Sequence, residues 1–266
     1  MNYKTYPKII ASEDIYKTKS KRKISFPTTR FYLKLGKIFV TANIIAKKGL
    51  YNRYNWVGTS LEVLDALESV GIEFEFSGMK NLHLVDTPVI FIANHISMME
   101  TLILPAIIQP IKPLVFVTKK QLSSMPIFGP INKNRYPIEV GRENPREDLR
   151  TVMEVGAQRI KDGRSILIFP QKTRTKFFNA SEFNTLGIKL AKRNNIPVIP
   201  IALITDAWEN GKFIKDFGKI RPDKKCYVAF GEPMKITGNG SEQHSKVLEF
   251  ITKKFTEWGR KDLIKA

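Results

Sequence analysis

The sequence predicts an α/β fold in which helices flank a mostly parallel central sheet. From about residue 70 onward, short apolar segments alternate with helix-like segments, which is the order of elements in βαβ units. A chain of 266 residues with 42% hydrophobic and 26% charged residues can also bury a full core. No internal repeat or linker divides residues 70–266, so we expect one domain there.

The elements of this fold can be assigned in order along the chain. The predicted strands are 74–78, 87–94, 114–118, 165–169, 197–203 and 226–230. Helices are predicted for 98–108, 144–163 and about 181–194, and from about 241 to the end of the chain. The helix at 144–163 has recognisable ends, because Asn144 stands at the N-cap, Pro145 in the first turn and Gly163 at the close.

The N-terminal part of the chain is strongly basic. The first 50 residues hold 12 Lys or Arg and two acidic residues, in a chain whose net charge is +19. The run KTKSKRK at 17–23 is either a solvated arm or a binding element for anionic lipid or nucleic acid. We therefore predict a basic arm and an N-terminal helical membrane-surface segment over 1–70, followed by an α/β domain over 71–266.

Residues 30–50 are predicted to form a basic amphipathic helix. Its apolar residues follow the 4-3-4-3 spacing of one helical face, and they are Phe31, Leu35, Ile38, Ala42 and Ile45. A basic amphipathic helix favours attachment to a membrane surface, and the alternative is a stripe that packs on the core of the domain. No apolar stretch reaches the roughly 18–20 residues that span a bilayer, so peripheral or monotopic attachment is expected.

Several other classes of protein fit the sequence poorly. The single cysteine, Cys226, allows neither an internal disulfide nor a cysteine cluster for zinc, and it suits a reducing compartment. The N-terminus has no apolar region typical of a secretory signal. There is no G-x-S-x-G, Walker or G-x-G-x-x-G motif. His83 and His244 lack nearby carboxylates at metal-ligand spacing, so no metal site is predicted.

A histidine and a carboxylate lie five positions apart in the segment ANHISMMET, residues 93–101. His95 follows a predicted strand, at the end where α/β folds place their ligand sites. Two interpretations of Glu100 are open. It can form a capping box with Ser97 by accepting from the Ser97 amide, or it can orient His95 as a general base.

A basic loop follows another predicted strand, in FPQKTRTK at 169–176. Arg174 offers a bidentate fork, Lys172 a point charge and Thr173 a hydroxyl, which together suit a phosphate group. The alternative is a solvated turn. Arg142, in VGREN, is another cation at the end of a strand.

Together, four segments resemble the glycerolipid acyltransferase family typified by 1-acylglycerol-3-phosphate acyltransferases. That family carries a histidine with an acid five positions later, a glycine–arginine block, an FPEGTRS-like loop and a proline-punctuated strand. This chain has, in the same order, NHISMME, MPIFGP followed by VGREN, FPQKTRT, and IPVIPIAL. The resemblance covers roughly residues 70–235, and the order of the blocks is more specific than any one block.

The resemblance implies roles for individual residues. His95 would be the general base that takes a proton from the acceptor hydroxyl, and Glu100 would orient it. The phosphate region of the acceptor would be bound by residues of the later blocks, which are Arg142, Gln171, Lys172, Thr173 and Arg174. The acyl donor would be acyl-CoA or acyl carrier protein, with no cofactor and no metal.

This chain departs from the family pattern at four positions. Glu100 replaces the usual aspartate, and Gly141 stands where an aspartate usually precedes the arginine. Gln171 replaces a glutamate and Lys172 a glycine, which makes the third block more positive by two charges. These changes bear on the acceptor more than on the type of reaction.

The sequence therefore predicts a membrane-associated O-acyltransferase that converts lysophosphatidate to phosphatidate. Another lysolipid or glycerol 3-phosphate is the alternative acceptor. A basic protein that binds nucleic acid through residues 17–23 is the alternative of a different class, but it explains neither the His95–Glu100 pair nor the apolar stripe. The predicted partners are a lysophospholipid, acyl-CoA or acyl carrier protein, and an anionic membrane surface on the cytoplasmic side, with no nucleic acid.

Overall fold

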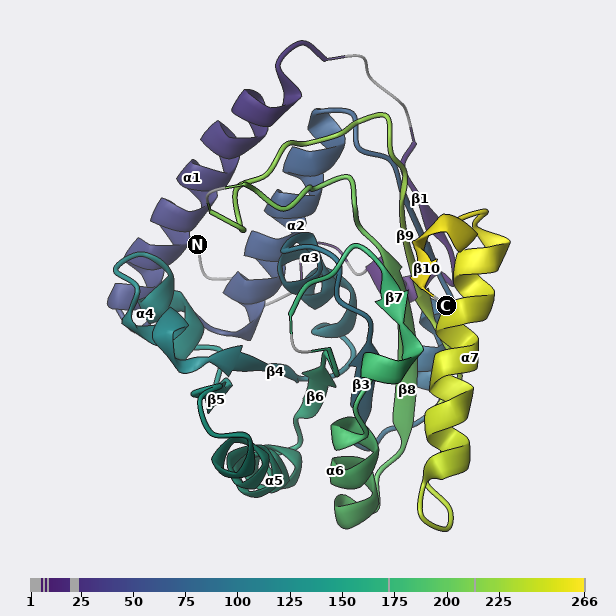
Figure 1. Cartoon of the computed structure of the whole chain (residues 1–266). Coiled ribbons are helices and arrows are strands. Elements are labelled where there is room, and N and C mark those ends of the chain that lie inside the picture. The colour runs from purple at the N-terminus through teal and green to yellow at the C-terminus, as the bar shows by residue number, and fades with distance from the viewer. Residues whose placement is uncertain are drawn as a thin grey trace.

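Figure 1 shows the computed structural model of the chain, which describes residues 6, 8, 10–19, 24–171, 173–212 and 214–265. Among these residues, an eight-stranded sheet runs in the order β1-β2-β9-β8-β3-β6-β4-β5. Its strands are β1 (Tyr16–Lys17), β2 (Phe74–Ser77), β3 (Ile90–Ala93), β4 (Leu114–Lys119), β5 (Ile138–Val140), β6 (Ser165–Ile168), β8 (Val198–Ile204) and β9 (Cys226–Phe230). A small parallel sheet joins β7 (Phe178–Asn179) to β10 (Ile264–Lys265).

The sheet is mostly parallel, as the sequence predicts. Strand β3 pairs in parallel with both β6 and β8, and β4 pairs in parallel with β5 and β6. Only the β1–β2 and β8–β9 pairs of the described sheet are antiparallel. Every residue of β3, β6 and β8 is buried, which explains why these strands are continuous apolar runs without alternation.

Helices cover both faces of this sheet (Figure 1). Among the described residues, the helices are α1 (Pro27–Lys47), α2 (Arg53–Ser69), α3 (Met99–Ile108), α4 (Phe128–Lys133), α5 (Pro145–Lys161), α6 (Leu186–Asn194) and α7 (Ser241–Glu257). Short 3-10 turns occur at Ile10–Ser12, Met79–His83, Lys120–Ser124, Ala180–Glu182 and Lys261–Leu263. Alternate residues of β3 face the two layers: Phe91 packs with α1, α2 and α3, whereas Ile90 packs with α5, α6 and α7.

The predicted ends of the helix after residue 144 are confirmed. The Asn144 side chain accepts hydrogen bonds from the amides of Arg146 and Glu147, and Pro145 opens α5. Gly163 follows the helix with a φ of 74°, a conformation that glycine adopts without steric cost. The sequence analysis did not assign helices α2 and α4 or the short strands β1, β5, β7 and β10.

The prediction that the Phe31–Ile45 stripe faces a membrane is wrong. Phe31, Leu35 and Ile38 have exposed fractions of 0%, 3% and 8%, because this face of α1 packs on the core of the domain. The Phe31 ring meets the Trp208 ring edge-on, with centroids 4.8 Å apart. The alternative interpretation of the stripe, packing on the core, is the one that the structure bears out.

The boundary predicted at residue 70 does not coincide with a break in the core. Helices α1 and α2 share one hydrophobic cluster with α3 and with the strands that follow them, and β1 adds to the edge of the sheet beside β2. Residues 20–23 of the basic run lie outside the described residues. The division into a membrane-surface segment and an α/β domain therefore stays a prediction about function.

The described part of the chain contains no helix with both the length and the apolar character needed to cross a membrane.

The burial of the α1 stripe predicts the effect of two neighbouring substitutions. Phe31→Ala removes a fully buried ring and is expected to lower the free energy of unfolding by about 3–5 kcal/mol. Leu33→Ala, at a position with an exposed fraction of 72%, is expected to change it by less than about 0.5 kcal/mol. Urea denaturation of both variants measures the difference, and equal stabilities would contradict the packing of α1.

Candidate active site

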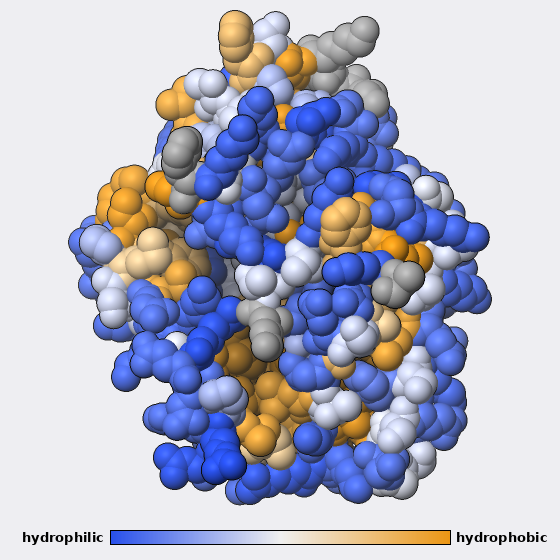
Figure 2. Space-filling model, viewed as in Figure 1, coloured by the Kyte–Doolittle hydropathy of each residue, from blue (hydrophilic) through white to orange (hydrophobic). Residues whose placement is uncertain are grey.

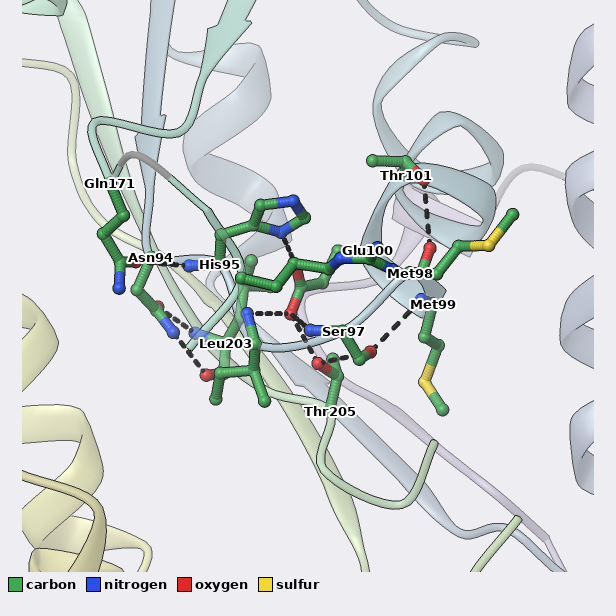
Figure 3. Close-up of polar contacts among 12 residues, drawn as sticks. Asn94, His95, Ser97, Met98, Met99, Glu100, Thr101, Gln171, Leu203 and Thr205 are labelled. Atoms are coloured by element: carbon green, nitrogen blue, oxygen red, sulfur yellow. Dashed lines mark hydrogen bonds and ion pairs between the residues drawn. The ribbon is translucent and has the colours of Figure 1, made fainter. Parts of the chain in front are cut away.

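The site begins where strand β3 ends. The Asn94 side chain acts as a backbone substitute toward β8: its Nδ2 donates to the Leu203 carbonyl and its Oδ1 accepts from the Leu203 amide, both at 2.8 Å (Figure 3). These two hydrogen bonds between the end of β3 and β8 hold the chain in place directly before His95. The next residue is thereby presented at the carboxyl edge of the sheet, where α/β folds bind their ligands.

His95 is held on several sides. Its amide donates to Gln171 Oε1 at 2.7 Å, and its carbonyl accepts from the Thr175 amide at 3.0 Å. The ring stacks on Phe169, with centroids 4.0 Å apart and planes 15° from parallel. Its Nδ1 is hydrogen-bonded to Glu100 Oε2, and its Nε2 points away from that carboxylate (Figure 3). The side chain is 15% exposed, so the ring is fixed but accessible.

The carboxylate of Glu100 is completely buried and shared among four donors. Its Oε1 accepts from the amides of Ile96 and Ser97, at 2.8 and 3.0 Å, and from the Thr205 hydroxyl. Its Oε2 accepts from His95. Glu100 therefore accepts from the Ser97 amide, as the capping-box interpretation expects, and its other oxygen holds the histidine. The capping box itself is incomplete, because the N-cap of α3 is Met98, without a side-chain cap bond, and Ser97 Oγ accepts from the Met99 amide at 3.2 Å.

This arrangement assigns the tautomer of His95. A carboxylate only accepts hydrogen bonds, so Nδ1 carries a hydrogen and Nε2 keeps its lone pair. If Nε2 takes up a proton, the imidazolium that forms is stabilised by the Glu100 carboxylate next to it. The pair can therefore act as a general base toward a hydroxyl group placed near Nε2.

Gln171 holds the basic loop against the histidine. Its Oε1 accepts from the His95 amide, while its Nε2 donates to Thr175 Oγ1 at 2.7 Å. The Thr175 hydroxyl in turn donates to the Phe177 carbonyl at 2.7 Å. One amide side chain thus serves as acceptor and donor at once, which a carboxylate at position 171 could not do. Lys172, the next residue of the predicted site, lies outside the described residues.

Arg142 is placed at the same edge of the sheet, after strand β5. Its φ of 66° is in the left-handed region, and the tight turn is held by Asp148, which accepts from the amides of Gly141 and Arg142 at 2.9 Å each. The pKa of Arg142 is lowered, first by partial burial and then by the Arg174 guanidinium, while Asp148 acts in the opposite direction. Arg142 and Arg174 are therefore near enough for their charges to influence each other.

Two lysines that the sequence analysis did not select complete this group. The pKa of Lys215 is lowered by desolvation and then by the positive charges of Arg174, Lys119 and Arg142, with Asp216 acting in the opposite direction. Lys119 ends strand β4, so its position at a strand end was a usable signal. Lys215 lies in a loop with no motif of its own. We call Arg142, Arg174, Lys119 and Lys215 the basic cluster.

The other histidines take no part in this site. The His83 ring nitrogen Nε2 is hydrogen-bonded to the Ala11 carbonyl at 3.0 Å, and His244 lies in the first turns of α7. Over the described ranges, no three His, Cys, Asp or Glu side chains are grouped as a metal ion would require.

Comparisons with known proteins agree with the site. A family model described as Acyltransferase matches residues 73–204, which include His95, Arg142 and Arg174. A 1-acyl-sn-glycerol-3-phosphate acyltransferase of Pseudomonas aeruginosa is 29% identical over 171 residues, or 64% of this chain and 62% of the relative. Over this part of its length, the chain is similar to the glycerolipid acyltransferases.

Other members of the family are similar over shorter regions. A 1-acyl-sn-glycerol-3-phosphate acyltransferase of Cocos nucifera is 26% identical over 62% of this chain and 52% of the relative. A lyso-ornithine lipid O-acyltransferase of Rhizobium meliloti is 33% identical over 32% of this chain and 28% of its own. The chain thus spans between about half and two thirds of these first two acyltransferases in length.

A solved structure shares the fold. The crystal structure of the 1-acyl-sn-glycerophosphate acyltransferase from Thermotoga maritima superposes with a TM-score of 0.66, covering 88% of this chain and 95% of the other at 18% identity. The two chains therefore share the same α/β fold.

The four bonds to Glu100 predict a cost for the amide variant. In Glu100→Gln, an NH₂ group replaces one carboxylate oxygen and cannot accept a hydrogen bond. At least one of the buried donors that bond to Glu100 therefore loses its acceptor. The free energy of unfolding is expected to fall by about 1–3 kcal/mol. The exposed Glu257→Gln on α7 serves as the matched control, with a change below about 0.5 kcal/mol. Urea denaturation gives both values, and equal stabilities would contradict the buried network.

Proposed function

We propose that this protein transfers a fatty acyl group from an acyl thioester to the free hydroxyl of a lysophospholipid. The acceptor is lysophosphatidate and the product is phosphatidate. The observation that carries the proposal is the His95–Glu100 pair, with Nε2 of the ring directed away from the carboxylate, at the same edge of the sheet as the basic cluster. The names of the relatives from Pseudomonas aeruginosa and Cocos nucifera support the same acceptor.

The reaction follows from the geometry of the ring. Nε2 of His95 takes the proton of the acceptor hydroxyl as that oxygen attacks the thioester carbonyl. The imidazolium is stabilised by Glu100 and then returns the proton to the thiolate that leaves. The acceptor supplies the nucleophile, so no acyl-enzyme forms. The donor is acyl-CoA or acyl carrier protein, and no cofactor is needed.

The basic cluster favours a phosphate on the acceptor. Arg142 and Arg174 offer planar forks that match phosphate oxygens, and Lys119 and Lys215 add point charges. A lyso-aminolipid, the class named for the relative from Rhizobium meliloti, would bring no phosphate to balance these charges. A nucleic-acid-binding role explains neither the buried Glu100 nor the orientation of His95.

We also propose that the protein binds the cytoplasmic surface of a membrane through the outward face of α1. That face carries large apolar side chains with high exposed fractions, which are Phe26 (78%), Leu33 (72%), Val40 (51%) and Ile44 (51%). Their spacing of seven, seven and four residues places them along one side of the helix. Exposed lysines lie on the same helix, at Lys34, Lys37 and Lys47, and they suit anionic lipid headgroups.

Neighbouring loops extend this apolar face. Met125 and Ile127, before α4, have exposed fractions of 48% and 50%, and Asn43 of α1 donates to the Ile127 carbonyl at 2.6 Å. Figure 2 shows apolar side chains gathered along the upper left of the molecule, over α1 and α4. Scattered exposed apolar residues are normal on a monomer, whereas a continuous group marks an interaction surface.

Removal of the ring is expected to abolish turnover. His95→Ala should lower the rate of thiol release from acyl-CoA, with lysophosphatidate as acceptor, by a factor of about 10²–10⁴. His83→Ala is the matched control, because its ring is hydrogen-bonded to the Ala11 carbonyl and not to a carboxylate, and it should retain activity. Thiol release is followed with a colorimetric thiol reagent. Turnover by His95→Ala at the wild-type rate would exclude His95 as the base.

The outward face of α1 predicts how the protein binds vesicles. Leu33→Gln combined with Val40→Gln leaves the charge unchanged but removes two exposed apolar side chains, so binding to vesicles of anionic phospholipid at high salt should fall. Leu149→Gln on α5, with an exposed fraction of 43%, is the control and should bind as the wild type does. Sedimentation with vesicles measures the bound fraction. Equal binding by all three proteins would place the attachment surface elsewhere.

A further inference from the structure

The loop between β8 and β9 joins the basic cluster from outside the family match. The match ends at residue 204, whereas Lys215 and Asp216 follow it by more than ten residues in the chain. We call residues 214–220 of this loop the strap. Its contacts with residues 173–174 bring two charged side chains of its own to the predicted phosphate site.

The strap holds the basic loop through both of these charged residues. Lys215 Nζ donates to Thr173 Oγ1 at 2.7 Å and to the Arg174 carbonyl at 3.0 Å. Asp216 accepts from the Arg174 guanidinium in an ion pair. The Arg174 side chain is only 15% exposed, so its orientation depends on this carboxylate.

The other end of the strap is fixed on α1. The Tyr32 hydroxyl donates to the Gly218 carbonyl at 2.7 Å, and the Ile220 amide donates to Thr28 Oγ1 at 3.1 Å. The Phe217 ring lies 5.5 Å from the Tyr32 ring, centroid to centroid. The strap therefore has a defined position between α1 and the basic loop, and it places Lys215 and Asp216 on a supported backbone.

The positive charges of the basic cluster favour the binding of an anion. The pKa of Lys215 is lowered first by desolvation and then by the positive charges of Arg174, Lys119 and Arg142, and Asp216 is the carboxylate that acts against them there. A guanidinium has five N–H donors and an ammonium three. The ion pair with Asp216 does not use all the donors of Arg174, and the two bonds of Lys215 leave a third N–H.

We propose that Lys215 is a direct ligand of the phosphate monoester of the acceptor and that Asp216 is a positioning residue that orients Arg174 toward the same phosphate. The proposal rests on the proposed function, because it takes the acceptor to be a lysolipid with a terminal phosphate. Lys215 supplies one N–H and one positive charge to the phosphate. Asp216 accepts from one part of the Arg174 guanidinium and keeps its remaining N–H groups turned toward the phosphate. Both residues determine specificity for a phosphate monoester over an uncharged headgroup.

Direct binding tests the role of Lys215 without turnover. The probe is glycerol 3-phosphate, a soluble phosphate monoester, with glycerol as the uncharged comparison, and binding to the full chain is measured by calorimetry. Lys215→Met should weaken binding of glycerol 3-phosphate by about 10–100-fold, the loss expected for one charge-assisted hydrogen bond. Lys215→Arg should restore most of the affinity. Lys219→Met removes the same charge from the strap, at a position that does not hold residues 173–174, and should bind as the wild type does.

A pair of variants at position 216 tests the positioning role. Asp216→Asn keeps an oxygen that can accept from Arg174 and should bind glycerol 3-phosphate nearly as well as the wild type. Asp216→Ala removes that acceptor and should weaken binding by about tenfold, although it makes the cluster more positive. In acyl transfer to lysophosphatidate, Lys215→Met and Asp216→Ala should raise KM and leave kcat within about threefold. A purely structural defect would lower kcat as well.

The results separate this proposal from the proposed function. Wild-type affinity in Lys215→Met, tighter binding in Asp216→Ala, or no binding of glycerol 3-phosphate by the wild type would each overturn the proposal. If the wild type binds glycerol 3-phosphate as described but releases no thiol with lysophosphatidate, the acyl-transfer function fails while the role of the strap stands. Circular dichroism of each variant verifies that it is folded before binding is compared.

Discussion

The buried carboxylate of Glu100 is the constraint on which the rest of the site depends. A carboxylate taken out of water costs several kcal/mol unless hydrogen bonds replace its hydration. The donors must therefore come from the protein, and they come from three residues of the loop after β3, which are His95, Ile96 and Ser97, and from Thr205 after β8. This requirement ties the helix start, the histidine and the neighbouring strand together. The Glu100 carboxylate thus fixes both the turn into α3 and the orientation of the His95 ring.

The parallel sheet explains why the charged residues meet. Strands β3, β4, β5, β6 and β8 run in the same direction, so the loops that follow them lie at one edge. His95, Arg142 and Arg174 come from three of these loops. The pKa of Lys215 is lowered first by desolvation and then by the positive charges of Arg174, Lys119 and Arg142. Such a site is organised for a ligand at some cost to the folded chain.

Helix α1 carries apolar side chains on two different faces. Its Phe31 face is buried among residues of the core, and its Leu33 face is exposed. A stripe of apolar residues at helical spacing has the same appearance whether it packs on a protein or on a lipid surface, since both exclude water. The sequence analysis selected the more regular stripe, and that regularity arises because a close-packed core demands it. The outward stripe is less continuous and mixed with lysines.

The sequence by itself determined the features whose signals are local. The alternation of apolar segments gave the α/β class, the spacing of Asn144, Pro145 and Gly163 gave the limits of α5, and the five-residue interval gave the His95–Glu100 pair. Only the tertiary structure decided which stripe of α1 is buried, that Thr205 donates to Glu100, and that Lys215 and Asp216 reach Arg174. These contacts join residues from about 40 to more than 100 positions apart. No local period records such a pairing, because it arises only when the strands have paired and the helices have packed on the sheet.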